Sequence, residues 1–137
     1  MSASDKAHAA LQCINRGDYQ QASQRFAQAV AESPTSNLFN DLGFAQLTCG
    51  RIEEAERSFR LALAIAPDHP QAAINLGALL ANSNRTEAAV PWLERGLSTA
   101  DQAQRPAVQQ LLATCKKAVA SAQTAIRAHS VAAPARR

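Results

Sequence analysis

Apolar residues recur along this chain with helical spacing rather than with the alternation of β-strands. Through the first hundred or so residues they return every three or four positions, which places them on one face of a helix. Polar dipeptides interrupt these runs at Gly17-Asp18, Gly50-Arg51 and Asn84-Arg85, where a residue in the left-handed region can end a helix. The pattern therefore predicts successive pairs of helices, each pair joined by a tight turn.

The same arrangement of small and aromatic residues repeats at a fixed interval. The first copy is Ala22, Phe26, Ala29 and Pro34; the second, 33 residues later, is Ala55, Phe59, Ala62 and Pro67; and a weaker third copy is Ala89, Leu93, Gly96 and Asp101. Ahead of the second and third copies stand the pairs Leu42-Gly43 and Leu76-Gly77, 34 residues apart, with Ala9-Ala10 at the equivalent place in the first. Because one helix pair cannot bury its apolar face alone, such repeats are expected to stack.

These residues resemble the tetratricopeptide repeat (TPR) family, whose pattern W-x2-L-G-x2-Y…A-x3-F…P marks a two-helix unit of about 34 residues. The second unit matches best, with Phe39 in place of the Trp. The resemblance implies an all-α fold, a right-handed superhelical stack of helix-turn-helix repeats. It predicts one TPR-like domain over residues 1–128, with repeats at about 3–35, 36–69 and 70–103.

Local signals indicate where individual helices begin. Ser36, Asp68 with Pro70 just inside, and Thr86 followed by Glu87 are the expected starts. Pro91 falls about a turn into the second helix of the third repeat, where it should remove one backbone hydrogen bond and bend the helix slightly.

Beyond residue 104 the repeat pattern ends, but apolar residues continue at steps of four and three. They form one seam, made of Val108, Leu112, Cys115, Val119, Ala122 and Ile126. We expect a helix over about 105–128 that caps the exposed end of the stack. This helix is long for a cap, so a seam for a homodimer or another partner is the alternative interpretation. Residues 129–137 lack periodicity and are predicted to form a disordered basic tail.

Composition and charge narrow the function classes. The chain has 31 alanines and six aromatic residues, and it has no apolar run long enough for a membrane span. The net charge of +3 divides into −3 over residues 1–101 and +6 over residues 102–137. The polar N-terminus indicates no secretory signal, and three cysteines without a C-x-x-C pair fit free thiols in a reducing compartment. We therefore expect a cytoplasmic protein.

Motifs for catalysis and for metal or cofactor binding are missing from the sequence. It contains no G-x-S-x-G, H-E-x-x-H, P-loop or G-x-G-x-x-G, and its cysteines and histidines have no metal-ligand spacing. Cys13 and Cys49 are expected to be packing thiols. The prediction is that the protein is not an enzyme and holds neither a cofactor nor a metal.

The resemblance implies a concave groove, lined by the first helix of each repeat, that binds a peptide or partner protein. The positions that match the lining are Leu11, Ile14, Asn15, Asn37, Asn40, Asp41, Phe44, Leu47, Gln71, Asn75, Ala78 and Asn82, with His8 and Ile74 also on these helices. Amide side chains can pair with a peptide backbone whatever its sequence, while Phe44 and the aliphatic residues offer an apolar floor. The competing interpretation is that some of them, especially Leu11 and Ile74, only pack between repeats.

Two subtypes of the family fit poorly. Members that clamp a C-terminal carboxylate use Lys and Arg on the first helices, but residues 37–48 and 71–83 contain neither. The basic residues Arg25, Arg57, Arg60 and Arg95 fall on second helices instead. Members with a ladder of asparagines are matched only at Asn75, because His8 and Asp41 replace the others.

The sequence thus predicts an adaptor or chaperone, including the small secretion-chaperone type, that binds another protein in its groove. The alternative is a structural subunit that assembles through the seam over 108–126. Nucleic-acid binding is disfavoured, because the six basic residues of the C-terminal segment are dispersed and no aromatic residue lies among them for base stacking.

Overall fold

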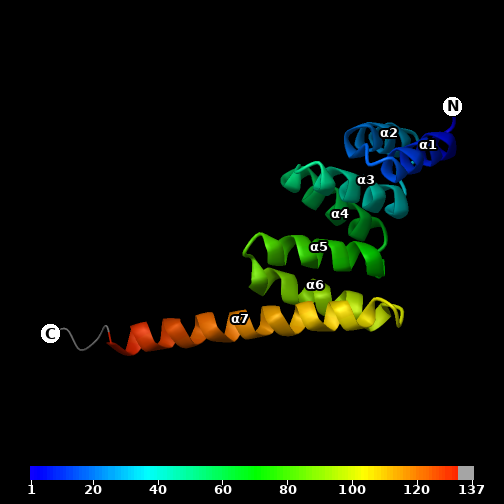
Figure 1. The fold of residues 1–137 in the computed structure, drawn as a ribbon. Helices are drawn as coiled ribbons and strands as arrows, with labels where there is room; N and C mark the ends of the chain where they lie inside the picture. The colour runs from blue at the N-terminus through cyan, green and yellow to red at the C-terminus, as the bar shows by residue number, and fades with distance from the viewer. Residues whose placement is uncertain (133–137) are drawn as a thin grey trace.

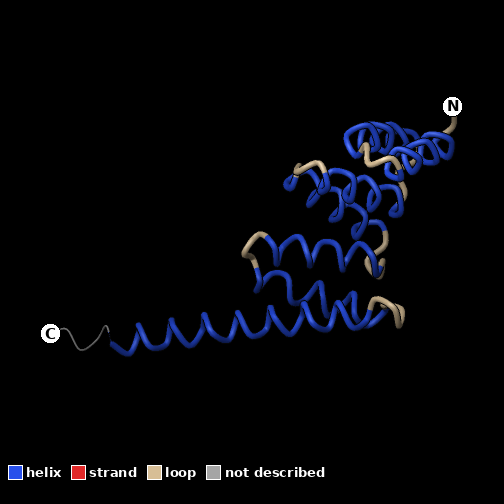
Figure 2. Tube along the Cα trace, viewed as in Figure 1, coloured by secondary structure: helices blue, strands red, loops and turns tan. Residues whose placement is uncertain are grey.

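The computed structural model describes residues 1–132, and within them the chain forms helices and no strand. Figure 1 shows helical hairpins stacked one after another, with a long helix across the last of them, and Figure 2 shows the short loops between helices. The helices are α1 (Ala3–Asn15), α2 (Tyr19–Glu32), α3 (Ser36–Thr48), α4 (Ile52–Ile65), α5 (Pro70–Asn82), α6 (Thr86–Thr99) and α7 (Arg105–Ala132). The predicted all-α stack of helix-turn-helix repeats is confirmed.

The turn inside each hairpin lies where the sequence predicted it. Gly17, Gly50 and Asn84 have φ values of +80°, +82° and +63°, so each adopts the left-handed conformation that ends the first helix. Pro91 lies inside α6, as expected from the sequence.

Helices α3, α5 and α6 begin at Ser36, Pro70 and Thr86, as the sequence predicted, but the residue that caps each helix is the one immediately before its first residue. The N-cap of α3 is Thr35 rather than Ser36, because the Thr35 hydroxyl accepts a hydrogen bond from the Leu38 amide at 3.2 Å. The N-cap of α5 is His69 rather than Asp68, because His69 Nδ1 accepts from the Ala72 amide at 3.1 Å. The N-cap of α6 is Arg85, which makes no capping bond through its side chain.

In the second and third hairpins, a glycine of the first helix faces a large apolar side chain of the second helix. A Cβ atom on Gly43 would lie 2.6 Å from Phe59 Cε1, and one on Gly77 would lie 2.6 Å from Leu93 Cδ2. These distances are well below van der Waals contact, so the two helices of a hairpin approach this closely only because the side chain is absent.

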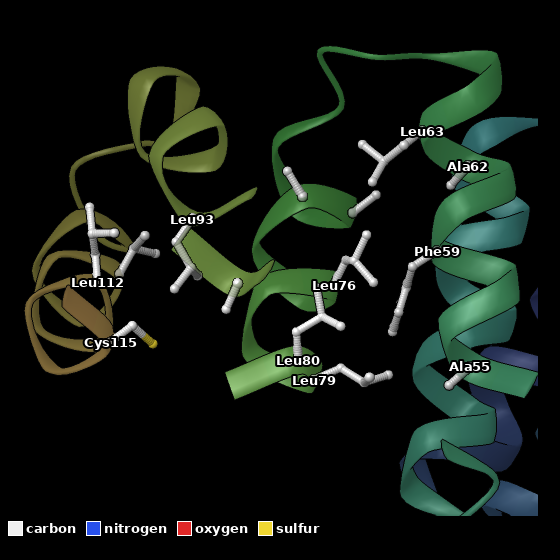
Figure 3. Close-up of a cluster of buried hydrophobic side chains, with 14 residues drawn as sticks. Ala55, Phe59, Ala62, Leu63, Leu76, Leu79, Leu80, Leu93, Leu112 and Cys115 are labelled. Atoms are coloured by element: carbon white, nitrogen blue, oxygen red, sulfur yellow. The ribbon is translucent and has the colours of Figure 1, made fainter. Parts of the chain in front are cut away.

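The buried residues form two clusters. The smaller one joins the first hairpin to α3 and is centred on Phe26. The larger one runs from α4 to α7 and contains Phe59, Leu76 and Leu93, as Figure 3 shows. Phe39 packs against both clusters, which makes the interior continuous through the stack.

The outer side of the stack carries an ion-pair network between the second and third repeats. Glu56 of α4 pairs with Arg85, which precedes α6, at 2.5 Å and with Arg60 of its own helix at 3.0 Å. Hydrogen bonding to Arg85, assisted by Arg60, lowers the pKa of Glu56 below its ordinary value. The carboxylate therefore stays ionised and continues to link the two repeats in mildly acidic solution.

The last helix covers the end of the stack with only its first half. Val108, Leu112 and Cys115 of α7 are buried in the larger cluster, whereas Ile126 is 66% exposed. The helix continues to Ala132, so the predicted end near 128 and the predicted start of a tail at 129 are wrong. The rest of that predicted tail, residues 133–137, lies outside the described residues.

Candidate functional site

The first helices of the repeats lie on one side of the stack. Helix α3 contacts α5, and α5 contacts α7, while successive second helices make no contact of similar extent. The stack therefore curves with α3 and α5 on its inner side, which is the side where the sequence predicted a groove.

Four amide side chains form a hydrogen-bonded row across this inner side. Gln104, in the loop before α7, donates through Nε2 to Gln71 Oε1 of α5 at 2.5 Å. Gln71 Nε2 donates to Asn75 Oδ1 at 3.1 Å, and Asn75 Nδ2 donates to Asn40 Oδ1 of α3 at 2.9 Å. We call these four residues the amide row. It links the second repeat, the third repeat and the start of the capping helix.

The four amides of the row keep N–H donors and oxygen lone pairs that their bonds to one another do not use. A primary amide offers two N–H donors and an oxygen with two lone pairs, and each link in the row uses one donor and one lone pair. The links also orient the amides before any ligand arrives, which reduces the entropy lost on binding. An extended backbone, which alternates N–H and C=O groups, matches this chemistry.

Asp41 is the single charged side chain on α3 and α5. Burial raises the pKa of its carboxyl above the ordinary value, and hydrogen bonding to Asn40 and the charge of His69 partly oppose that rise. Lys6, on α1, is held in an ion pair with Glu32 of α2. The centre of the inner side is thus neutral to weakly negative.

The predicted apolar residues divide into two groups. Phe44 is 41% exposed and meets the ring of Tyr19 edge to face, with centroids 6.5 Å apart, and Leu11 is 47% exposed. In contrast, Ile14 and Leu47 are partly buried and pack against the two clusters. Phe44 and Leu11 are therefore the apolar side chains that remain available to a ligand.

The remaining predicted positions are scattered along the same helices. Asn37 is bonded through Oδ1 to His69 Nε2 at 2.7 Å, Ala78 is half-buried, and Asn15 and Asn82 are exposed at the ends of α1 and α5. Ile74 faces α6, where Gly96 leaves room for it, so the packing interpretation holds for that residue.

Gln104, Tyr19 and His69 take part in this surface but were absent from the predicted lining. A signal for Gln104 existed in the sequence, because Asn37, Gln71 and Gln104 follow one another at intervals of 34 and 33 residues. Extending the repeat register one step past the third unit finds it. The contact of Tyr19 with Phe44 joins two repeats and has no comparable periodic signal.

Residues 1–132 contain neither a cluster of metal-ligating side chains nor a helix suited to crossing a membrane. No three His, Cys, Asp or Glu side chains in this part of the chain converge as metal ligands. None of its helices combines the length and the apolar character needed to cross a membrane.

Comparison with known proteins gives one family and many related structures. Residues 7–133 match the family described as the middle TPR-like domain of cilia and flagella-associated protein 70. No curated protein sequence matches the chain.

Three solved structures illustrate the structural similarity. The TPR domain of Sgt2 from Aspergillus fumigatus is 20% identical with a TM-score of 0.80, covering 89% of this chain and 82% of that one. The first TPR of Spaghetti (RPAP3) bound to the HSP90 peptide SRMEEVD is 19% identical with a TM-score of 0.80, at coverages of 87% and 94%. The Yersinia enterocolitica secretion chaperone SycD in complex with a YopD peptide is 17% identical with a TM-score of 0.77, at coverages of 82% and 91%. These TM-scores establish a shared fold.

Proposed function

The chain belongs to the family of the middle TPR-like domain of cilia and flagella-associated protein 70, and from this premise we propose that it is a protein-interaction module. Its partner is a polypeptide segment that lies along the inner side of α1, α3 and α5. The observation that carries the proposal is the amide row, which presents pre-oriented donors and acceptors beside the exposed ring of Phe44.

The charge of the inner side indicates the class of segment. Asp41 is the single charge on α3 and α5, and no Lys or Arg lies on either helix to receive a carboxylate. A neutral or cationic segment in an extended conformation is therefore the proposed ligand, read mainly through its backbone. This differs from the acidic peptide SRMEEVD held by the Spaghetti domain.

The biological role that we propose is that of an adaptor or chaperone, including the secretion-chaperone type. The shared fold with SycD, which was solved with a translocator peptide, supports this role. Catalysis is not part of the proposal, because the inner side combines amides, one carboxylate and apolar side chains without a nucleophile beside a base. The three free cysteines support our expectation of a reducing compartment such as the cytoplasm.

Replacing Asn40 and Phe44 together with alanine is expected to abolish recovery of the partner. Asn40 is only 7% exposed and accepts the last bond of the amide row, and Phe44 supplies the exposed apolar contact. Immobilised wild-type and Asn40→Ala/Phe44→Ala proteins would be incubated with extract from the native source and the bound proteins quantified. Circular dichroism checks that helicity is retained.

The matched control for this experiment is Leu61→Ala. Leu61 is 48% exposed but lies on α4, away from the amide row, so recovery should equal that of the wild type. Equal recovery by wild type and the folded double variant would refute groove binding.

An acidic C-terminal peptide is expected not to bind. Synthetic SRMEEVD should give no saturable signal by fluorescence anisotropy up to about 1 mM, a limit that corresponds to a binding free energy weaker than about −4 kcal/mol. The reason is that its terminal carboxylates would meet Asp41 and amides instead of cations. Saturable micromolar binding would contradict the proposed ligand class.

A further inference from the structure

The apolar seam on α7 passes from buried to exposed without leaving its face of the helix. Val108, Leu112 and Cys115 are buried against the stack, Val119 is half-buried, and Ile126 is 66% exposed. Val119 and Ile126 are seven residues apart, which returns them to the same side after two turns. The exposed half is therefore a continuation of a surface that already packs against helix α6.

A groove opens where α7 leaves α6. It has a volume of about 280 Å³ and is lined on the α6 side by Glu87, Val90, Pro91 and Glu94, and on the α7 side by Lys116, Val119, Ala120 and Gln123. Figure 1 shows α7 continuing past this point toward the C-terminus, with no other helix beside it. The groove and the exposed seam thus adjoin one another.

The α6 wall of the groove is acidic, whereas α7 itself is basic. Helix α7 contains no acidic residue, and Lys116, Lys117 and Arg127 lie along its exposed part. Glu87 and Glu94 line the groove and make no ion pair within residues 1–132. An apolar helix that carries a cation fits this groove, and the distal half of α7, with Ile126 followed by Arg127, has that chemistry.

We propose that two copies of the chain pair through the distal halves of their α7 helices, running antiparallel about a twofold axis near Ala122 and Gln123. This register places Ile126 of each copy opposite Val119 of the other, at the groove. It also brings Arg127 of each copy toward Glu87 and Glu94 of the other. A parallel pairing would instead set Arg127 opposite Arg127, away from the two glutamates, which line the groove beside Val119.

The contact is small, so the association is weak. It consists of about two helical turns and one groove from each copy, which lies at the lower end of specific interfaces and corresponds to a dissociation constant on the order of 10–100 μM. The dimer therefore forms and dissociates with concentration rather than being permanent.

Sedimentation equilibrium between about 5 and 500 μM tests the pairing, a range chosen to bracket the expected dissociation constant. The apparent mass of the wild type should rise from 14.6 kDa toward twice that value as concentration increases. Ile126→Asp should remain a monomer throughout and keep its fold, because Ile126 is exposed. Leu61→Asp, which removes a similarly exposed side chain from α4, should associate as the wild type does.

Charge exchange tests the register. Glu87→Arg/Glu94→Arg should weaken association at least 10-fold, and adding Arg127→Glu should recover most of that loss. A wild-type chain that stays monomeric over the whole concentration range overturns the proposal. Association that is insensitive to Ile126→Asp, or a charge exchange without recovery, overturns it as well.

Discussion

Replacing Phe59 with alanine is expected to lower the free energy of unfolding by about 3–5 kcal/mol. The Phe59 side chain is completely buried in the larger of the two clusters, where it points from α4 toward α5 (Figure 3). Its ring also lies against Gly43 of α3. Its removal leaves a cavity that the glycine cannot fill. The change would be measured by urea denaturation followed by circular dichroism.

The expected loss is large relative to the total free energy of unfolding of the protein. Single domains are stable by about 5–15 kcal/mol, and a stack of repeats depends on the interface of each unit with its neighbours. Phe59 belongs to the second repeat and joins it to the third, so the variant should unfold at a markedly lower urea concentration. Phe44→Ala is the matched control, because its ring is 41% exposed and the expected loss is about 1 kcal/mol. Similar losses for both variants would show that Phe59 does not hold the second and third repeats together.

Replacing Gly77 with valine is expected to destabilise the third repeat by about 3 kcal/mol, at the upper end of the range for overpacked cores. A Cβ atom on Gly77 would lie 2.6 Å from Leu93 Cδ2 and 3.3 Å from the Leu93 backbone nitrogen. The leucine side chain could turn away, but the backbone of α6 could not, so the two helices of the hairpin must separate. Urea denaturation gives the size of the effect.

The control for Gly77→Val is Ala78→Val, one residue further along α5 at a half-buried position. It carries the same β-branched side chain in the same helix and should cost less than about 1 kcal/mol, the range of helix propensity. Leu93→Ala should be less damaging in the Gly77→Val background than in the wild type, because it removes the overlapping side chain. If the losses in free energy of unfolding for Gly77→Val and Leu93→Ala were strictly additive, the close approach of residues 77 and 93 would be contradicted.

Several elements of the fold were predictable because their signals are local or repeated. The turns at Gly17, Gly50 and Asn84 need a left-handed residue, and those residue types occur there. The capping residues were less predictable than the helix starts, since a cap depends on which side chain reaches a free amide. His69 performs this role at α5 through its imidazole, which propensity alone does not indicate.

The candidate site was predicted only as a set of positions. Asn40, Gln71 and Asn75 were placed on the inner helices from the repeat register, but the bonds that join them were not. Those bonds depend on how far α3, α5 and the loop before α7 are shifted relative to one another. The same shift determines that Ile74 faces α6 rather than the inner side.

The sequence by itself determined the class of structure, because the helical period and the 33 to 34-residue interval recur often enough to exclude a sheet. It also determined that α3 and α5 carry one carboxylate and no cation, which follows from residue identity alone. Only the tertiary structure decided which amides form the row. It also decided that the seam on α7 is buried against the stack up to Cys115 but exposed at Ile126. The physical reason is that contacts between helices depend on their relative placement in space, which no spacing along one helix specifies.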